Sequence, residues 1–133
     1  REELLTKDSR SVLPGQFSFR DAVRAGSIGN VLVGALLTGD YSLAGKMMRS
    51  DLYHQPYRRK FVPHFDQIEE VACKEGAFGV CLSGAGPTVL CCCEKGKGEH
   101  VREKLAEAFP EHDYLLLRTD RSGSVVNITN CVK

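Results

Sequence analysis

The sequence predicts an α+β fold in which an antiparallel sheet is covered by a layer of helices. Segments with helical spacing precede two short apolar segments joined by a glycine-rich turn, and a further helix and two strand-like segments follow. Consecutive strands, together with helices that can all lie on one face, suggest an antiparallel sheet under a layer of helices. At 133 residues, the chain fits one domain, residues 1–133.

The overall composition excludes some partner classes. The chain is 42% hydrophobic and 26% charged, as in an ordinary soluble globular domain. A net charge of +1 gives no electrostatic reason for nucleic acid or a membrane surface as a partner. No apolar run approaches the ~20 residues that a membrane-spanning helix needs. We therefore expect neither nucleic acid nor a membrane as a partner.

The first strong helical pattern begins at Ser18. Before it, residues 4–13 fit either an extended segment or a single helical turn, and both remain open. Ser18 or Phe17 is placed near the N-cap, Asp21 lies in the first turn and Gly39 is placed as a C-cap. Apolar residues recur at three- and four-residue steps and predict one broad buried face, formed by Ala22, Val23, Ile28, Val31, Leu32, Ala35 and Leu36.

Two further helices are expected in the first half of the chain. One begins at residues 40–42 and runs toward Leu52. A basic connection, residues 54–60, follows it, and Pro63 is then expected to open the next helix as a first-turn proline. Gly76 ends that helix, whose predicted inner face comprises Phe65, Ile68, Val71 and Ala72.

The second half of the chain contains the predicted strands. Residues 77–81 and 89–93 are apolar and read as two strands on either side of the glycine-rich turn. A helix is expected over residues 99–109. Residues 112–119 and 124–129 are expected to form two last strands.

The turn between the first two strands is a candidate anion site, formed by Ser83, Gly84, Ala85, Gly86, Pro87 and Thr88. Gly84 and Gly86 allow backbone conformations closed to other residues, and they leave no side chain between the main chain and a ligand. Successive amides of such a turn can form a concave nest for an anion. A tight hairpin turn without a ligand explains the same residues equally well.

Six cysteines raise the question of disulfides or a metal. Cys91, Cys92 and Cys93 are consecutive in a strand, so their side chains alternate between its faces and do not converge on one ion. No Cys-x-x-Cys pair occurs, and the four histidines lack ligand spacing. We expect no metal site, buried free thiols and a reducing, cytoplasmic setting.

Arg58 is a candidate for binding an anionic group. It follows the rigid Pro56 within the basic connection. Arginine suits a carboxylate or a phosphate because its planar fork donates two parallel hydrogen bonds. The alternative is a solvated loop whose charges bind nothing specific.

Three segments together resemble a known family. Residues 6–14 fit a Thr-x-x-x-Arg-x-x-Leu-Pro pattern, residues 56–58 read Pro-Tyr-Arg, and residues 82–90 fit a glycine-rich signature. In this order the chain resembles the GHMP kinases, and the two arginine patterns are similar to those of the homoserine kinase branch. The resemblance covers nearly the whole chain but only the C-terminal half of such an enzyme. It implies the ferredoxin-like C-terminal domain of that family.

The resemblance also implies an activity, namely phosphoryl transfer from ATP to the hydroxyl of L-homoserine. By position, Arg10 and Arg58 would bind the substrate carboxylate, Thr6 would lie near the reacting hydroxyl, and residues 83–88 would border the active site. No catalytic residue is assigned to this chain.

The family's nucleotide-binding pattern, Pro-x-x-x-Gly-Leu-Gly-Ser-Ser, does not occur in the sequence. We therefore expect ATP and Mg²⁺ to be bound by an N-terminal domain of the same polypeptide. Neither is expected to bind to this chain alone, and this chain alone is expected to be inactive.

Three alternatives remain open. The chain could belong to another GHMP kinase whose substrate carries a carboxylate, such as a mevalonate-type enzyme. It could instead be an amino-acid-binding regulatory module, or a structural domain that mediates dimerisation and binds no ligand. A homodimer is left open under every one of these interpretations.

Overall fold

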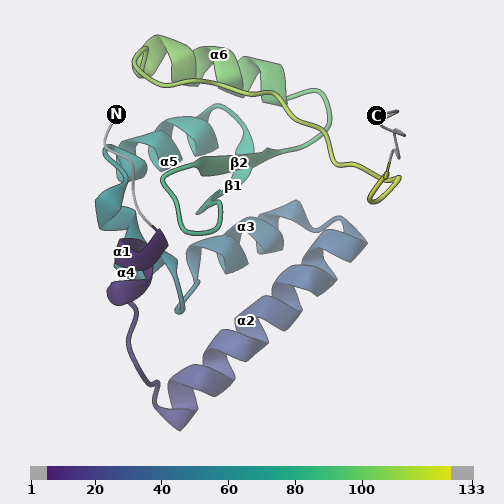
Figure 1. The fold of residues 1–133 in the computed structure, drawn as a ribbon. Coiled ribbons are helices and arrows are strands. Elements are labelled where there is room, and N and C mark those ends of the chain that lie inside the picture. The colour runs from purple at the N-terminus through teal and green to yellow at the C-terminus, as the bar shows by residue number, and fades with distance from the viewer. Residues whose placement is uncertain (1–5, 127–133) are drawn as a thin grey trace, which may run out of the picture.

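A computed structural model describes residues 6–126 of the chain (Figure 1). Its elements are α1 (Thr6–Ser11), α2 (Phe19–Thr38), α3 (Tyr41–Arg49), α4 (Gln55–Arg58), a 3₁₀ turn η1 (Arg59–Phe61), α5 (Phe65–Lys74), β1 (Ala77–Leu82), β2 (Val89–Cys93) and α6 (Gly98–Ala108). The predicted α+β class with an antiparallel sheet is confirmed. Over these residues, none of the helices combines the length and apolar character needed to cross a membrane.

The sheet consists of β1 and β2, which pair antiparallel from Leu82 opposite Val89 to Ala77 opposite Cys93. The register shifts between Ala77 and Gly79, so Phe78 is an extra residue on β1, as in a β-bulge. Both strands were predicted from their apolar, β-branched composition, and their bounds agree with the prediction to within one residue.

Helices lie on both sides of this sheet, and not all on one face as expected, because both α3 and α5 pack against β1. Figure 1 shows α5 and α6 above β1 and β2, and α3 followed by α2 below them. The core lies between α5, α6 and the sheet, and its buried residues are Val62, Phe65, Ile68, Ala72, Ala77, Val80, Val101 and Leu105. Three of the four inner residues predicted for α5 belong to this core.

The predicted caps of α2 are confirmed, but its predicted buried face is too broad. The Ser18 hydroxyl accepts from the Asp21 amide at 3.1 Å, and Gly39 takes a left-handed φ of 75°. Only a narrow stripe that includes Ala25 and Ala35 is buried. The expected core residues Val23, Val31 and Leu36 are exposed. The reason is that α3 is the main neighbour of α2, and one neighbouring helix covers one side only.

Two connections differ from expectation. The basic segment after residue 54 is helical, forming α4 and η1. Of the two alternatives for residues 4–13, the described part agrees with the helical one, since Thr6–Ser11 forms the short helix α1. Pro63 was predicted to open the third long helix. That prediction is wrong, since α5 begins two residues later at Phe65 and His64 occupies its N-cap with a φ of 60°.

The two last strands were also predicted wrongly. Residues 112–119 and 124–126 contain no strand, and residues 127–129 lie outside the described part of the chain. The Tyr114 hydroxyl donates to the carbonyl oxygens of Leu105 at 2.9 Å and Phe109 at 2.8 Å. The segment is therefore attached to the end of α6 and does not extend the sheet, and Figure 1 shows the chain after α6 running back beside that helix.

Candidate functional site

Arg58 is the central residue of the candidate site. It ends α4, and only 8% of it is exposed. Its Nε donates to the carbonyl oxygen of Ser9 at 3.0 Å, and its Nη1 donates to the carbonyl oxygen of Gly84 at 3.3 Å. Nη1 also lies 3.3 Å from Nδ1 of His54, which is the acceptor because arginine only donates. Arg58 thus connects α1, α4 and the glycine-rich turn.

Ser9 makes a second connection between the same segments. The residue is completely buried, and its hydroxyl donates to the carbonyl oxygen of Ala85 at 2.7 Å. Ser9 was not predicted as a site residue. The sequence offered one signal for Ser9, which was its position beside Arg10 within the first arginine pattern. A serine by itself does not indicate that its hydrogen-bond partner lies 76 residues away.

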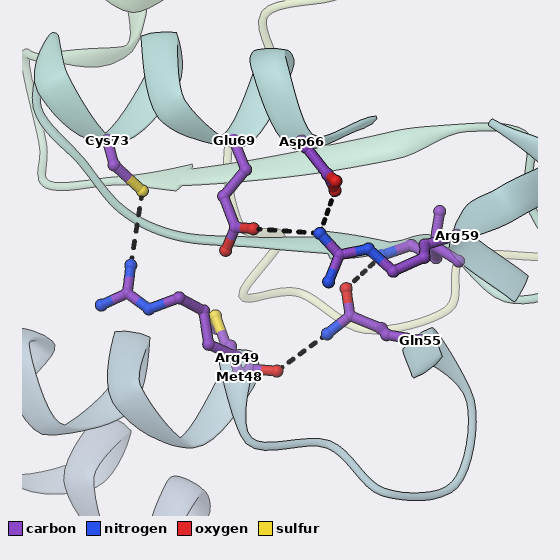
Figure 2. Close-up of polar contacts among 8 residues, drawn as sticks. Met48, Arg49, Gln55, Arg59, Asp66, Glu69 and Cys73 are labelled. Carbon is purple, nitrogen blue, oxygen red and sulfur yellow. Dashed lines mark hydrogen bonds and ion pairs between the residues drawn. The ribbon is translucent and has the colours of Figure 1, made fainter. Parts of the chain in front are cut away.

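Asp51 and Gln55 position α4. The Asp51 carboxylate accepts from the backbone amides of Tyr53 and His54, both at 2.9 Å, and of Gln55 at 2.7 Å. The Gln55 Nε2 donates to the carbonyl oxygen of Met48 at 2.8 Å, and its Oε1 accepts from the Leu82 amide at 3.3 Å (Figure 2). These bonds fix the helix that carries Arg58 between the end of α3 and the end of β1.

An open cavity of about 520 Å³ adjoins Arg58. Its wall is mainly apolar and comes from α2, α3 and the end of β1, including Ala25, Ile28, Leu32, Met47, Met48 and Leu82. The polar side chains in the wall are Asp51, His54, Gln55 and Arg58. A largely apolar cavity of this size with a few polar groups is typical of a small-molecule site.

The neighbouring Arg59 is engaged with acidic side chains and remains partly exposed. Its guanidinium forms an ion pair with Asp66 and a second one with Glu69 at 3.8 Å (Figure 2). It also lies 5.1 Å from the centre of the Phe65 ring. A smaller cavity of about 150 Å³ between these charges therefore presents an arginine that is already paired.

The glycine-rich turn is a tight hairpin turn. The Ser83 amide donates to the carbonyl oxygen of Thr88 at 2.9 Å, and the Gly86 amide donates to that of Ser83 at 3.1 Å. Gly84 and Gly86 have φ angles of 59° and 83°, in the left-handed region that favours glycine. Two of the amides expected to face an anion are thus bonded within the turn. The amides left for the predicted nest are those of Gly84, Ala85 and Thr88.

The other two predicted substrate residues belong to α1, and Arg10 is not part of the cavity wall. Thr6 is the first residue of α1, and Arg10 lies in its last turn with an exposed side chain. The structure brings Arg58 to the backbone of Ser9, next to Arg10. It does not bring the Arg10 side chain to the cavity in this conformation.

Five cysteines lie in the described part of the chain, and all are free and half-buried rather than fully buried as predicted. Burial raises the pKa of the Cys81, Cys92 and Cys93 thiols, and it raises the pKa of Cys91 to about 12. Cys131 lies outside this part. Among residues 6–126, no group of three His, Cys, Asp or Glu side chains is arranged to hold a metal ion.

A comparison with known protein families identifies the family of this chain. The sequence profile described as GHMP kinases C terminal matches residues 32–111, which is more than half of the chain. The chain therefore belongs to the GHMP kinase family and contains its C-terminal domain.

Within the GHMP kinase family, the curated proteins that this chain resembles include homoserine kinases. The chain is 48% identical over 124 residues to a homoserine kinase from Bacillus velezensis, and 51% identical over 124 residues to one from Bacillus pumilus. Each alignment covers 93% of this chain but only 40% of the relative. The chain thus spans about two fifths of the length of the curated relatives that it matches.

The fold of the chain is also similar to that of a solved homoserine kinase structure. The chain superposes on the crystal structure of homoserine kinase from Cytophaga hutchinsonii with a TM-score of 0.72 and 31% identity. The superposition covers 83% of this chain and 35% of the solved one.

Proposed function

We propose that this chain is the substrate-side C-terminal domain, residues 1–133, of an ATP-dependent homoserine kinase. The whole enzyme would transfer the γ-phosphate of ATP to the hydroxyl of L-homoserine, a step of threonine biosynthesis. The proposal is supported by the family assignment and by relatives named homoserine kinase that are similar over nearly all of this chain.

The arrangement around Arg58 is the observation that best supports a substrate-side role for this domain. This buried guanidinium joins the three segments on which the resemblance was based and borders a mainly apolar cavity. A small amino acid offers its carboxylate as the strongest point of recognition, and a short aliphatic chain suits an apolar wall.

The bonds of Arg58 limit how it would bind that carboxylate. Its Nε and Nη1 already donate to protein atoms, so Nη2 is the nitrogen left for a ligand among the contacts of residues 6–126. A single nitrogen does not form the two-pronged contact of a free fork. A second cation is then needed, and we assign it to Arg10, whose exposed side chain lies one residue beyond Ser9. Thr6 is assigned to orient the reacting hydroxyl, and residues 83–88 border the site.

The nucleotide and its metal are assigned to the rest of the enzyme. Among residues 6–126, no three His, Cys, Asp or Glu side chains are arranged around one point. The nucleotide-binding pattern of the family does not occur in this sequence either. We therefore derive no step through ATP or Mg²⁺ here. We assign both to an N-terminal domain of the same polypeptide, and we expect this chain alone to be inactive.

The expected setting is the cytoplasm. Free thiols in the described part of the chain are typical of a reducing compartment. L-Homoserine and the N-terminal domain are the partners that this proposal requires.

Coupled ADP release tests the proposal. The complete polypeptide that carries this chain is assayed with ATP and homoserine, mevalonate or buffer, and the 133-residue chain serves as the control. Release by the complete polypeptide that depends on homoserine, with none from the short chain, is the expected result. Release with mevalonate only would assign another GHMP kinase. Homoserine binding by the short chain without any kinase activity of the complete polypeptide would indicate a regulatory module.

A further inference from the structure

His54 directly precedes α4 and belongs to the wall of the large cavity beside Arg58. Its side chain makes no capping hydrogen bond to that helix. Asp51 fills this role, since its carboxylate accepts from the backbone amides of residues 53–55. The imidazole contacts Arg58 instead, with its Nδ1 lying 3.3 Å from the arginine Nη1.

The contact with His54 completes the hydrogen bonding of one arginine nitrogen. Nη1 of Arg58 carries two hydrogens. One is donated to the carbonyl oxygen of Gly84 at 3.3 Å, and Nδ1 of His54 is the acceptor for the other. Nε is bonded to the carbonyl oxygen of Ser9. Three acceptors therefore fix the plane of the guanidinium, and with it the direction in which Nη2 points.

Only one of these three acceptors depends on pH. The two carbonyl oxygens accept at any pH, whereas Nδ1 of His54 accepts only while the imidazole is neutral with its proton on Nε2. A protonated imidazole would be a second cation 3.3 Å from the guanidinium, and the two would repel each other. Arg58 is only 8% exposed, so water has little access to replace the lost acceptor. His54 is itself exposed and exchanges protons with the solvent.

We propose that His54 is a positioning residue for Arg58. In its neutral form it directs Nη2 of Arg58 toward the substrate carboxylate, and its protonation weakens substrate binding. This inference rests on the proposed function, in which Arg58 binds the carboxylate of homoserine. Imidazole changes charge between about pH 5 and pH 8, so the effect falls near neutral pH.

The other groups that face His54 do not explain such a pH dependence. The remaining titratable residues in the described cavity wall are Asp51, Tyr53, Arg58 and Cys81. Carboxylates, phenols and guanidinium groups do not ordinarily change charge between about pH 6 and pH 8. Burial raises the pKa of the Cys81 thiol, which keeps its proton in this range. The wall residues from α2 and α3 are apolar or glycine, and none of residues 7–11 of α1 belongs to the wall.

Steady-state kinetics of the complete polypeptide test the inference. KM for homoserine and KM for ATP are measured from about pH 6 to pH 8 for the wild type, His54→Asn and His54→Ala. In the wild type, KM for homoserine is expected to rise roughly fivefold as the pH falls, a factor that corresponds to one ordinary hydrogen bond.

The two variants separate the acceptor from the proton. Asparagine keeps an acceptor oxygen near the place of Nδ1 and does not titrate, so His54→Asn is expected to show the low KM for homoserine at every pH. His54→Ala has no acceptor and is expected to show the high KM at every pH. The pH dependence of KM for ATP is expected to be the same in all three proteins.

His100→Asn is the matched control. His100 is exposed like His54, but its Nε2 lies 2.8 Å from a carboxylate oxygen of Glu75, and it is not among the residues of the cavity wall. This variant is expected to keep the wild-type pH profile for homoserine.

Nitrogen NMR of the complete polypeptide with isotope-labelled histidine tests the contact itself without any turnover. The His54 signals are assigned by their loss in His54→Asn. At neutral pH, Nδ1 of His54 is expected to be unprotonated, and Arg58→Ala is expected to shift its resonance because the donor is removed.

Three results would overturn the inference. These are a wild-type KM for homoserine that stays constant over this pH range, a pH profile that persists in His54→Asn, and a proton on Nδ1 of His54 at neutral pH. Absence of homoserine turnover at every pH would contradict the proposed function. The NMR result distinguishes the two failures, because an unprotonated Nδ1 that responds to Arg58→Ala would support the positioning role alone.

Discussion

The Nε of Arg58 donates to the carbonyl oxygen of Ser9 at 3.0 Å, across 49 residues of sequence. Both residues are buried, and the Ser9 hydroxyl continues the connection to Ala85 in the glycine-rich turn. Three segments that appear separate in the sequence are thereby held in one arrangement. The position of the turn depends on a buried serine and a buried arginine as well as on its own glycines.

The first prediction concerns Ser9. Ser9→Ala removes the 2.7 Å hydrogen bond to the Ala85 carbonyl and leaves that acceptor without its buried donor. We expect the free energy of unfolding to fall by about 1–2 kcal/mol in urea titrations. Ser11→Ala is the matched control, because the Ser11 hydroxyl bonds the Asp8 carbonyl at an exposed position of the same helix. We expect it to change stability by less than about 0.5 kcal/mol. Equal losses in the two variants would argue against a special role for Ser9.

The second prediction concerns the contact between α3 and β1. A Cβ on Gly45 would lie 1.7 Å from the carbonyl oxygen of Phe78, the extra residue of β1. Both atoms belong to regular elements, so Gly45→Ala must push α3 away from the strand. We expect a loss of about 1–3 kcal/mol in the free energy of unfolding.

Gly29→Ala in α2 is its control, because a Cβ there meets nothing within 4 Å. That substitution is expected to stabilise the chain, by up to about 1 kcal/mol, through helix propensity alone. A tolerated Gly45→Ala would show that α3 and β1 pack less closely than described.

The third prediction concerns pH. Burial, with the neighbouring thiols adding to it, raises the pKa of Cys91 from 9.0 to about 12. The unfolded chain therefore loses this proton at a lower pH than the folded chain does. The stabilisation is complete below pH 9.0 and declines as the pH rises toward 12. We expect the urea midpoint to fall over this window, and Cys91→Val to make the fall shallower. An unchanged slope in the variant would assign the effect to other groups.

Local features of the fold were predictable from the sequence, whereas burial and long-range pairing were not. The caps of α2 and the strands around the glycine-rich turn depend on residues close together in the chain, such as Ser18 with Asp21. The exposure of Val23 and Leu36 depends on which elements pack against α2, and no local pattern contains that information.

The segment after α6 illustrates the same limit. Its apolar residues suit a strand, but a strand also needs a neighbour for its backbone. Instead, Tyr114 attaches the segment to the end of α6. A pattern of side chains therefore predicted strands where the chain has no strand neighbour.

In the candidate site, the sequence identified Arg58 but not its partners. Composition and a preceding proline are local, whereas the carbonyls of Ser9 and Gly84 come from distant segments. The role of Asp51, which accepts three backbone amides just before α4, was missed for a related reason. An aspartate ahead of a short turn is common, and only the structure shows that this turn carries the arginine.

The most direct test of the account is the steady-state kinetics of Arg58→Lys in the complete polypeptide. Lysine keeps the charge but loses the planar fork. Arg59→Lys is the matched control, because Arg59 is the next residue and its guanidinium is paired with Asp66 and Glu69. We predict that Arg58→Lys raises KM for homoserine roughly tenfold or more while KM for ATP changes by less than about twofold, and that Arg59→Lys changes neither. Equal effects of Arg58→Lys on both substrates, or equal effects of the two variants on homoserine, would contradict the assignment of Arg58 to the substrate carboxylate.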